Sequence, residues 1–453
     1  MKKTVFAVAS FAFGCCLAAE PGIEEGSVKL GPGENFWTVT YTLTGTPAVV
    51  TIDLQTNTLA DATGDWVSIG GENIGVLGGE ANKMVYVTNT PVTAYWFPQK
   101  ACPGKTFAAG TLRAEVTAYP TNIPPDYMVI DLLARNMVRW YATTNALPGG
   151  FANPEYKTTK MVMRKIPAKN VVWMMGSPGK PDDDNTGTSM TNAPAHKVML
   201  TEDYYIGIYE VTQSQYSNMG GMNVSLYTNE VDAAFRPAER LSTDIVRGGK
   251  NYMWHKNGHE VAPSSPLNIL RGRCGIADMD LPSEAQWEYA CRAGSATECH
   301  GNLEGTIANI KKYAVTHGYA EKAENTYAPV GAKMEYRPSV VGSKLPNDWG
   351  IYDMLGNVYE LCLDASGIGA NLEAFLESLA EGWETGAVTV DPKGATNEGN
   401  IRITKRGGSF RDNHNESTCR VRNDGSNNYA DGLDGKLGYI GIRLCCSVKE
   451  AVK

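Results

Sequence analysis

The residues from 406 to 422 come closest, in side-chain type and spacing, to an active site. The segment reads RGGSFRDNHNESTCRVR. Asp412, His414 and Ser417 evoke a hydrolase triad, but all three lie within one short stretch, which is a poor geometry for a proton relay. The segment contains a single cysteine, Cys419 near its end. Soft-metal thiolate chemistry therefore lacks its donors in the middle of this segment.

A second pattern is typical of a cation site. Asp353 and Glu360 stand seven residues apart, with Gly356 and Val358 between them. Ca²⁺ takes roughly six to eight oxygen ligands from carboxylates and backbone carbonyls, and a curled loop of this length can supply them. The alternative is a turn whose carboxylates cap nearby amides. We expect calcium here in a structural role.

The composition is that of a folded protein with many turns. The chain has 453 residues, of which 42% are hydrophobic and 20% charged. The 48 glycines and 22 tyrosines predict long loops and little helix. The net charge of −8 is spread along the chain, so it argues against a nucleic-acid or anionic-membrane surface.

The first 19 residues are predicted to be a signal peptide. Lys2 and Lys3 precede the apolar run from Val5 to Gly14, and Leu17-Ala18-Ala19 provides a small-residue cleavage site. We therefore expect export to the periplasm or the cell exterior. Cys15 leaves a lipid anchor as the alternative. No later apolar run has the length of a transmembrane segment.

Residues 20–120 are predicted to form a small all-β module with a sandwich-like arrangement. β-Branched and aromatic residues alternate over the strands expected at residues 36–43, 48–54 and 112–119. The Gly-rich stretch at 70–79 is expected to be a loop. Residues 121–160, with strand-like runs at 127–133 and 137–141, are expected to be a connector to the second domain at 161–448.

One helix of the second domain is well signalled. Ser283 is the expected N-cap, and Gln286 at the third helical position completes a capping box. Trp287 and Ala290 then fall on one face of the helix, and Gly294 is expected to end it.

Six segments in order resemble the formylglycine-generating enzyme (sulfatase-modifying factor) family. They are Met175–Ser177, Pro194–Tyr216, Leu281–Gly294, Asn347–Asp364, Arg406–Phe410 and Gly438–Cys445. The resemblance implies an α+β fold of the C-type-lectin-like type with little regular secondary structure. It also implies calcium at Asp353, Gly356, Val358 and Glu360, and a sulfatase-like protein or peptide, or an envelope ligand, as partner.

The family's oxidase site uses two cysteines shortly after the Gly-Gly-Ser motif to bind copper(I). Counting forward from Ser409 places Asp412 and Ser417 at these positions, and counting back from Cys419 places His414 at the second. None is a cysteine, and carboxylate and hydroxyl groups are hard ligands. We therefore expect neither copper nor the family's oxidase chemistry.

The resemblance also implies a substrate groove. Ser409 and Arg422 match residues at the family site, and Tyr359 stands where the oxidase has tryptophan. A groove for a peptide or small ligand is one interpretation. The other is that Ser409 and Arg422 support the fold.

The cysteines match two family disulfides, Cys274–Cys445 and Cys291–Cys419. Cys446 competes with Cys445 for the first pairing. Buried free thiols are the alternative, although export favours bridges. Cys102, Cys299 and Cys362 have no assigned partner.

The function expected from the sequence is that of an exported, non-oxidase member of this family, acting as a binding or scaffold module. The alternative is an active oxidoreductase that converts a sulfatase cysteine to formylglycine through altered ligands such as His414. A third possibility is a surface component that uses the lectin-like fold for adhesion.

Overall fold

The computed structural model describes most of the chain from residue 19 to its end. The described residues are 19–59, 63–107, 110–135, 137–176, 195–249, 252, 254–297, 299–303, 306–317, 321–322, 336–366, 385–394, 402–412, 417–424 and 438–453. The predicted signal peptide and His414 therefore lie outside them, apart from residue 19. The described residues contain no helix long and apolar enough to cross a membrane.

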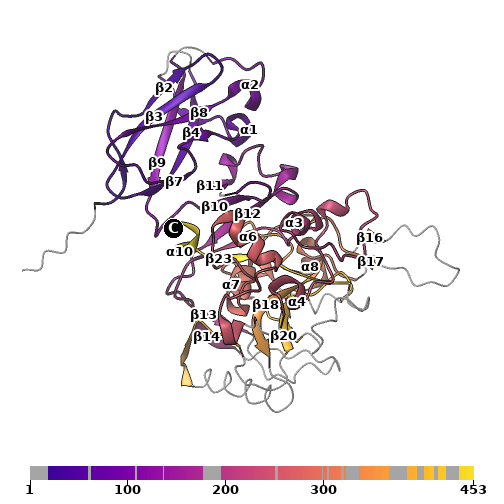
Figure 1. Ribbon diagram of the computed structural model, residues 1–453. Coiled ribbons are helices and arrows are strands. Elements are labelled where there is room, and N and C mark those ends of the chain that lie inside the picture. Colours follow the sequence, from indigo (N-terminus) through magenta and orange to yellow (C-terminus); the bar gives the residue numbers. More distant parts are fainter. Residues whose placement is uncertain are drawn as a thin grey trace, which may run out of the picture.

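The N-terminal module consists of two β-sheets around one hydrophobic cluster (Figure 1). All the predicted strands are present, within a few residues of their expected ends. One sheet contains β1 (Gly22–Ile23), β2 (Lys29–Pro32), β3 (Trp37–Thr44), β6 (Gly78–Gly79) and β8 (Pro91–Trp96); the other contains β4 (Ala48–Asn57), β5 (Trp66–Ser68), β7 (Lys83–Val85) and β9 (Leu112–Tyr119).

The strands β8 and β9 alternate in burial as the sequence predicts, whereas β4 is buried along almost its whole length. The buried side chains of Tyr41, Leu54 and Trp96 belong to the shared cluster. The expectation of a plain loop at residues 70–79 was wrong. This stretch holds the short helix α1 (Gly71–Ile74) and the strand β6, because Ile74 and Leu77 are buried in the core. A second short helix, α2 (Pro98–Ala101), follows β8.

Residues 121–160 do more than connect the two parts. Their strands β10 (Tyr127–Asp131) and β11 (Val138–Tyr141) form one edge of a five-stranded sheet. The sheet continues through β12 (Lys160–Ile166), β15 (Tyr204–Gly207) and β23 (Cys445–Ser447). The predicted connector is thus part of the second domain's central sheet.

The same segment also contacts the N-terminal module. The amide of Trp140 donates to the carbonyl of Asn82 at 2.8 Å, and Arg139 Nη1 donates to the carbonyl of Ala81 at 2.6 Å. The C-terminus lies at this junction (Figure 1), where Tyr86 Oη donates to the carbonyl of Lys453 at 2.8 Å. The interface between the two domains therefore contains hydrogen bonds made by the chain's C-terminal end and by the edge strand β11.

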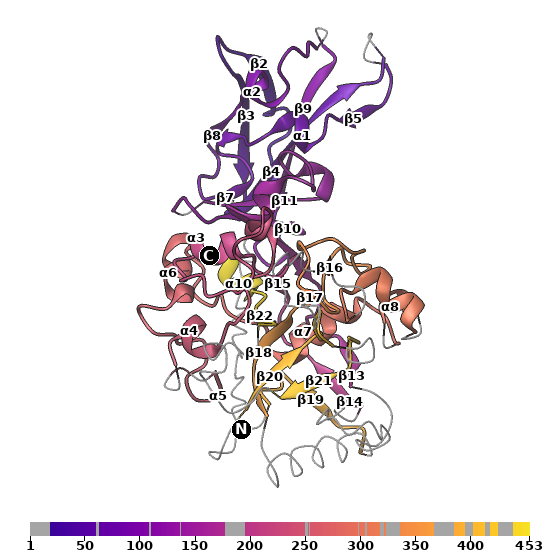
Figure 2. The ribbon, with the colours of Figure 1, turned by 90° about the vertical axis from the view of Figure 1, so that its right-hand side faces the viewer.

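A second, four-stranded sheet lies farther from the N-terminal module (Figure 2). It has the order β21 (Arg422–Asp424), β20 (Arg402–Arg406), β18 (Tyr359–Ser366) and β22 (Ile440–Gly441). Two smaller sheets complete the domain: β13 (Val172–Met175) with β14 (His196–Met199) and β19 (Val388–Val390), and β16 (Glu321–Lys322) with β17 (Tyr336–Arg337).

The helices are short, as the loop-rich composition predicts. The predicted helix is α7 (Glu284–Arg292), with the capping box of Ser283 and Gln286 in place. It ends at Ala293 in the left-handed conformation, one residue before the expected Gly294. The others are α3 (Gln213–Asn218), α4 (Thr243–Arg247), α5 (Trp254–Asn257), α6 (Pro266–Cys274), α8 (Ile307–Tyr313) and α10 (Val448–Ala451), with the 3₁₀ turns η1 (Thr144–Ala146), η2 (Pro154–Lys157), η3 (Ala233–Phe235) and η5 (His300–Asn302).

A buried ion pair joins the two larger sheets and α7. Arg443 Nε lies 3.0 and 2.9 Å from the two carboxylate oxygens of Glu360, and both residues are almost fully buried. Arg443 also donates to the carbonyls of Gly207 and Tyr352, each at 2.9 Å. Trp287 Nε1 of α7 donates to Glu360 Oε2 at 2.6 Å. Every charge in this group therefore has partners on several elements.

We predict that Arg443→Met destabilises the protein by roughly 3–5 kcal/mol, because it leaves the Glu360 carboxylate buried without its cation. Lys160→Met is the matched control, since its partner Glu155 is half-exposed and such pairs contribute about 1 kcal/mol or less. Chemical denaturation of both variants measures the difference. Equal losses of unfolding free energy would contradict a special role for the buried pair.

Candidate functional site

The site predicted from the sequence is built on the strand β18 and its neighbours. Because side chains alternate along a strand, Tyr359 and Glu360 point to opposite faces of the sheet. Glu360 pairs across the sheet with Arg406, and Leu361 pairs with Lys405. Glu360 and Arg406 therefore share the face toward α7, whereas Tyr359 and Lys405 share the other face.

On that other face, cationic side chains lie over aromatic rings. Lys405 Nζ is 4.5 Å from the ring centre of Tyr359 and 5.4 Å from that of Tyr439. The guanidinium of Arg411 is 5.6 Å from the Tyr439 ring and 5.5 Å from the Phe410 ring. These five residues are called the cation–aromatic group below. Tyr359 is buried, whereas Arg411 is exposed and Tyr439 half-buried.

The turn after β20 brings Ser409 and Phe410 beside this group. Gly407 has φ 95°, and a Cβ there would lie 3.1 Å from the carbonyl oxygen of Met354 and 3.2 Å from the Trp287 ring. Glycine is therefore required by both backbone conformation and space. The amide of Gly356 donates to the carbonyl of Gly407 at 2.7 Å, which fixes this turn against the loop before β18.

Ser409 and Asp412, both predicted site residues, bind each other. The Ser409 hydroxyl donates to Asp412 Oδ2, and the Ser409 hydroxyl oxygen accepts the amide of Arg411 at 3.2 Å. Ser409 is fully buried, which agrees with a role in supporting the turn. Asp412 is half-buried, and its carbonyl accepts the amide of His317 at 2.9 Å.

The other two positions that replace the family cysteines are not brought into this arrangement. His414 lies outside the described residues. Ser417 is fully buried, and its hydroxyl has no hydrogen-bond partner in the part of the chain that the structure describes. A hydrolase relay through Asp412 and Ser417 thus gains no support from the geometry.

Arg422 does not line the predicted groove. Its Nη2 atom lies 2.6 Å from Glu284 Oε2, and its side chain is 2% exposed. Neighbouring Arg406 pairs with Glu284 at 3.1 Å and also with Glu288. Burial, followed by the charge of Glu284, raises the pKa of Asp364 in this cluster to about 7. Arg422 therefore belongs to an interior ion network, which is the structural interpretation that the sequence left open.

Glu239 is a titratable residue near the cation–aromatic group that the sequence analysis did not find. It is fully buried, and its Oε2 atom lacks a hydrogen-bond partner among the described residues. Its neighbour Gly438 precedes Tyr439, and a Cβ on Gly438 would lie 3.4 Å from that oxygen. Burial raises the pKa of Glu239 to about 7, against the opposing effects of the Leu226 and Tyr227 amides. No motif surrounds Glu239, so only the fold reveals it.

The predicted calcium loop is held by protein groups that the sequence did not predict. Glu210, fully buried, accepts the amide of Val358 at 3.0 Å and Nδ2 of Asn357 at 2.6 Å. Glu360 is engaged by Arg443 and Trp287. Of the two predicted carboxylate ligands, Asp353 alone retains an oxygen, Oδ1, that is buried and unpartnered among the described residues.

Carboxylate side chains nevertheless outnumber cationic side chains around this loop. Glu210, Asp353 and Glu360 interact electrostatically with one another and with Arg443. Burial raises the pKa of Asp353 to about 6, and Arg443 and Lys157 oppose that rise. The surplus of carboxylates and the free oxygen of Asp353 fit a cation, whereas the ion pair of Glu360 does not.

All eight cysteines outside the first 18 residues are buried thiols in this structure. Cys291 and Cys419 are neighbours, as the predicted pairing requires, and hydrogen bonding from Cys291 lowers the pKa of Cys419 to about 5. Cys274 packs in the same hydrophobic cluster as Cys446, whereas Cys445 packs in another. The alternation of β23 thus directs Cys446, and not Cys445, toward Cys274.

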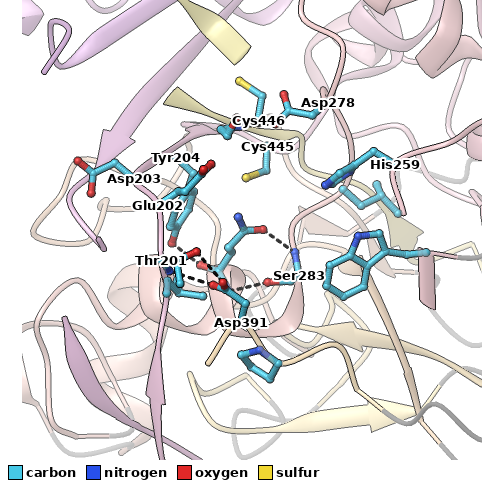
Figure 3. A pocket seen from close by; sticks show the side chains of 16 residues that line it. Thr201, Glu202, Asp203, Tyr204, His259, Asp278, Ser283, Asp391, Cys445 and Cys446 are labelled. Atoms are coloured by element: carbon cyan, nitrogen blue, oxygen red, sulfur yellow. Dashed lines mark hydrogen bonds between the residues drawn. The ribbon is translucent and has the colours of Figure 1, made fainter. Parts of the chain in front are cut away.

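A separate open pocket of about 190 Å³ lies beside β15, α7 and β23 (Figure 3). The sulfur of Cys445 points into it, near Tyr204 and Ser283, as Figure 3 shows. Burial raises the pKa of the Cys445 thiol, which keeps it protonated and weakly nucleophilic. The pocket contains none of the predicted groove residues Ser409, Arg422 and Tyr359.

We predict that Glu239→Gln removes a pH dependence of stability. The folded-state pKa of about 7 exceeds the ordinary value of 4.5, so the stabilisation by Glu239 is complete below pH 4.5 and is lost as pH rises through 7. The loss amounts to at most ~3 kcal/mol. Unfolding free energies at pH 5 and pH 8 test this, with Glu155→Gln as an exposed control. Parallel slopes for wild type and Glu239→Gln would contradict it.

Comparison with known proteins identifies the second domain. The model of the sulfatase-modifying factor enzyme 1-like domain family matches residues 156–447. The formylglycine-generating enzyme of Bos taurus is 27% identical over 299 residues, which cover 58% of this chain and 68% of that enzyme. The chaperone protein LppX of Paenibacillus barcinonensis is 28% identical over 189 residues, 37% of this chain.

The chain spans 64% of the length of LppX, just under two thirds. Among solved structures, PvdO from Pseudomonas aeruginosa is similar with a TM-score of 0.42 and 22% identity, over 63% of this chain and 94% of PvdO. The family match alone covers well over half of the chain and includes the strands β12 to β22 that carry the site. The chain therefore belongs to the sulfatase-modifying factor enzyme 1-like domain family.

Proposed function

We propose that this protein is an exported member of its family that binds a peptide or protein segment and does not catalyse formylglycine formation. One observation carries the proposal: the sequence has no cysteine between Ser409 and Cys419. The replacement at one family position, Asp412, is a hard oxygen ligand already bound to Ser409. The predicted signal peptide at residues 1–19 supports export.

The cation–aromatic group supports a binding role. Its outer members, Arg411 and Tyr439, offer a guanidinium and an aromatic ring to a ligand. The buried Lys405 packs against the Tyr439 ring and against the buried Tyr359. A guanidinium recognises a carboxylate through paired hydrogen bonds. A peptide segment with acidic side chains is therefore the ligand class that fits. Relatives named formylglycine-generating enzymes are consistent with a polypeptide partner.

We also propose that the Asp353–Glu360 loop binds calcium, in the lectin-like fold expected of the family. The support is the unpartnered Asp353 oxygen and the surplus of buried carboxylates around it. The carbonyls of Gly356 and Val358 are the further ligands expected. Glu360 would have to leave Arg443 to take part, so Asp353 is the ligand that we assign first. A bound cation would fix the loop that supports Gly407.

The decisive test of the proposed function is a conversion assay. A peptide containing Cys-x-Pro-x-Arg is incubated with the protein, copper, oxygen and a thiol reductant, and mass spectrometry follows the loss of the cysteine thiol. We expect no aldehyde product, because the two thiolates that bind copper(I) are missing. An authentic formylglycine-generating enzyme run in parallel shows that the conditions work. Aldehyde formation that Asp412→Ala abolishes would overturn the non-oxidase proposal.

A peptide-binding measurement tests the proposed binding role. Fluorescence anisotropy of a Glu-rich peptide should report binding that Arg411→Ala weakens by at least ~5-fold, the effect of losing one charge-assisted contact. Lys311→Ala on α8 is the control, because it removes an exposed cation elsewhere. Equal affinities for both variants would exclude the cation–aromatic group as the binding surface.

Calcium binding predicts a calcium-dependent melting temperature. At about 100 times the dissociation constant, free calcium should raise the melting temperature by roughly 5–10 °C over protein treated with EGTA. Restoration by Ca²⁺ and not by Zn²⁺ makes the effect specific. Asp353→Asn should abolish the shift, whereas Asp348→Asn, an exposed control, should keep it. An unchanged melting temperature on calcium removal would refute the site.

A further inference from the structure

Three donor side chains of metal-binding type meet in the interior of the second domain. Cys291 is on the last turn of α7, His300 begins the turn η5, and Cys419 lies shortly before β21. The two Sγ atoms and a ring nitrogen of His300 all lie within 4.8 Å of one another. Both cysteines are 0% exposed and His300 is 2% exposed. The three side chains therefore form a buried cluster that is closed to solvent.

The histidine of this cluster has an unsatisfied nitrogen. His300 Nδ1 is buried without a hydrogen-bond partner in the described part of the chain. Its ring is held in place by Tyr313, which packs edge-on at 5.2 Å between ring centres. A buried polar atom without a partner is costly and uncommon in folded proteins. The His300 ring also hydrogen-bonds to Cys419, so the imidazole faces the two sulfurs, and this arrangement points to a ligand that the three share.

The charges around the cluster suit a divalent cation. Arg292, the nearest positive side chain in sequence to Cys291, already pairs with Glu288 at 2.7 Å. Two thiolates and a 2+ ion sum to zero, and a third thiolate would leave one negative charge, which the nearby Arg292 opposes because its charge interacts with Cys291 and Cys419. Thiolate and imidazole are the donors of structural zinc sites, which are closed to solvent and four-coordinate.

We propose that Cys291, Cys419 and His300 bind a zinc ion, with Cys299 as the fourth ligand. Cys299 directly precedes His300 and is also fully buried. Its sulfur is not among the donor atoms that lie within 4.8 Å of one another, so the Cys299 side chain would have to turn toward the other three to complete the site. The site links the end of α7 to η5 and to the segment before β21. It is independent of the proposed binding function.

A disulfide between Cys291 and Cys419 is the competing state. It would use the same two sulfurs, but it would leave the His300 imidazole and the Cys299 thiol without a role. Zinc binding gives a role to all four side chains. The two states also differ in composition. The disulfide form holds no metal and two hydrogens fewer than the reduced protein, whereas in the zinc form the cysteines are thiolates that take up their protons again when zinc is removed.

The first measurement is made on the full-length wild-type protein, purified without chelator. Elemental analysis should find one equivalent of zinc, and thiol titration after zinc release should recover Cys291 and Cys419 as free thiols. Cobalt substituted for zinc should give an intense sulfur-to-cobalt charge-transfer band. A metal-free protein whose intact mass shows the Cys291–Cys419 disulfide would overturn the proposal.

Two variants assign the ligands. His300→Gln should weaken zinc binding more than ~10-fold, the loss that even outer-sphere partners of a metal site can cause. His196→Gln on β14 is the matched control, since His196 is also buried but lies outside the cluster. Cys299→Ser should retain the metal with a weaker charge-transfer band. If His300→Gln fails to fold, the cobalt spectrum of Cys299→Ser decides: an unchanged spectrum removes Cys299 from the site.

Discussion

The ion pair between Arg443 and Glu360 is the interaction on which the rest of the second domain depends. Arg443 lies just before β23, and its guanidinium donates to the carbonyl of Gly207 at the end of β15. It therefore contacts the buried side of the five-stranded sheet. Glu360 belongs to β18 of the other large sheet and also accepts Trp287 of α7. Because the group is buried, each charge is tolerable only while its partners remain in place.

This constraint explains how one strand serves two purposes. The face of β18 that carries Glu360 is committed to the interior, together with Arg406 and the acids of α7. The opposite face is left to Tyr359 and to the residues over its ring. A calcium role for Glu360 competes with its structural role, whereas Asp353 has no such conflict. The candidate binding surface is thus supported from the opposite face of β18 by buried ion pairs.

Local patterns predicted local structure well. The capping box at Ser283 predicted α7, and alternating β-branched residues predicted β9 at Leu112–Tyr119, because both depend on neighbours in sequence. The contacts of charged residues were harder. Arg422 matched a groove position in sequence but pairs with Glu284, more than 130 positions away along the chain. Glu239 and His300 lie in no recognised motif, and Glu210 lies in a family-like segment that does not single it out, because burial and long-range partners give these residues their character.

The family-like frame persists around Ser409, whereas the two thiols that copper chemistry needs are missing between Ser409 and Cys419. The mass of the Cys-x-Pro-x-Arg peptide after incubation with copper and oxygen decides whether this protein oxidises a substrate cysteine. We expect the cysteine to be recovered intact, while an authentic formylglycine-generating enzyme converts it. Catalytic appearance of the formylglycine aldehyde with this protein would show that the oxidase chemistry is retained.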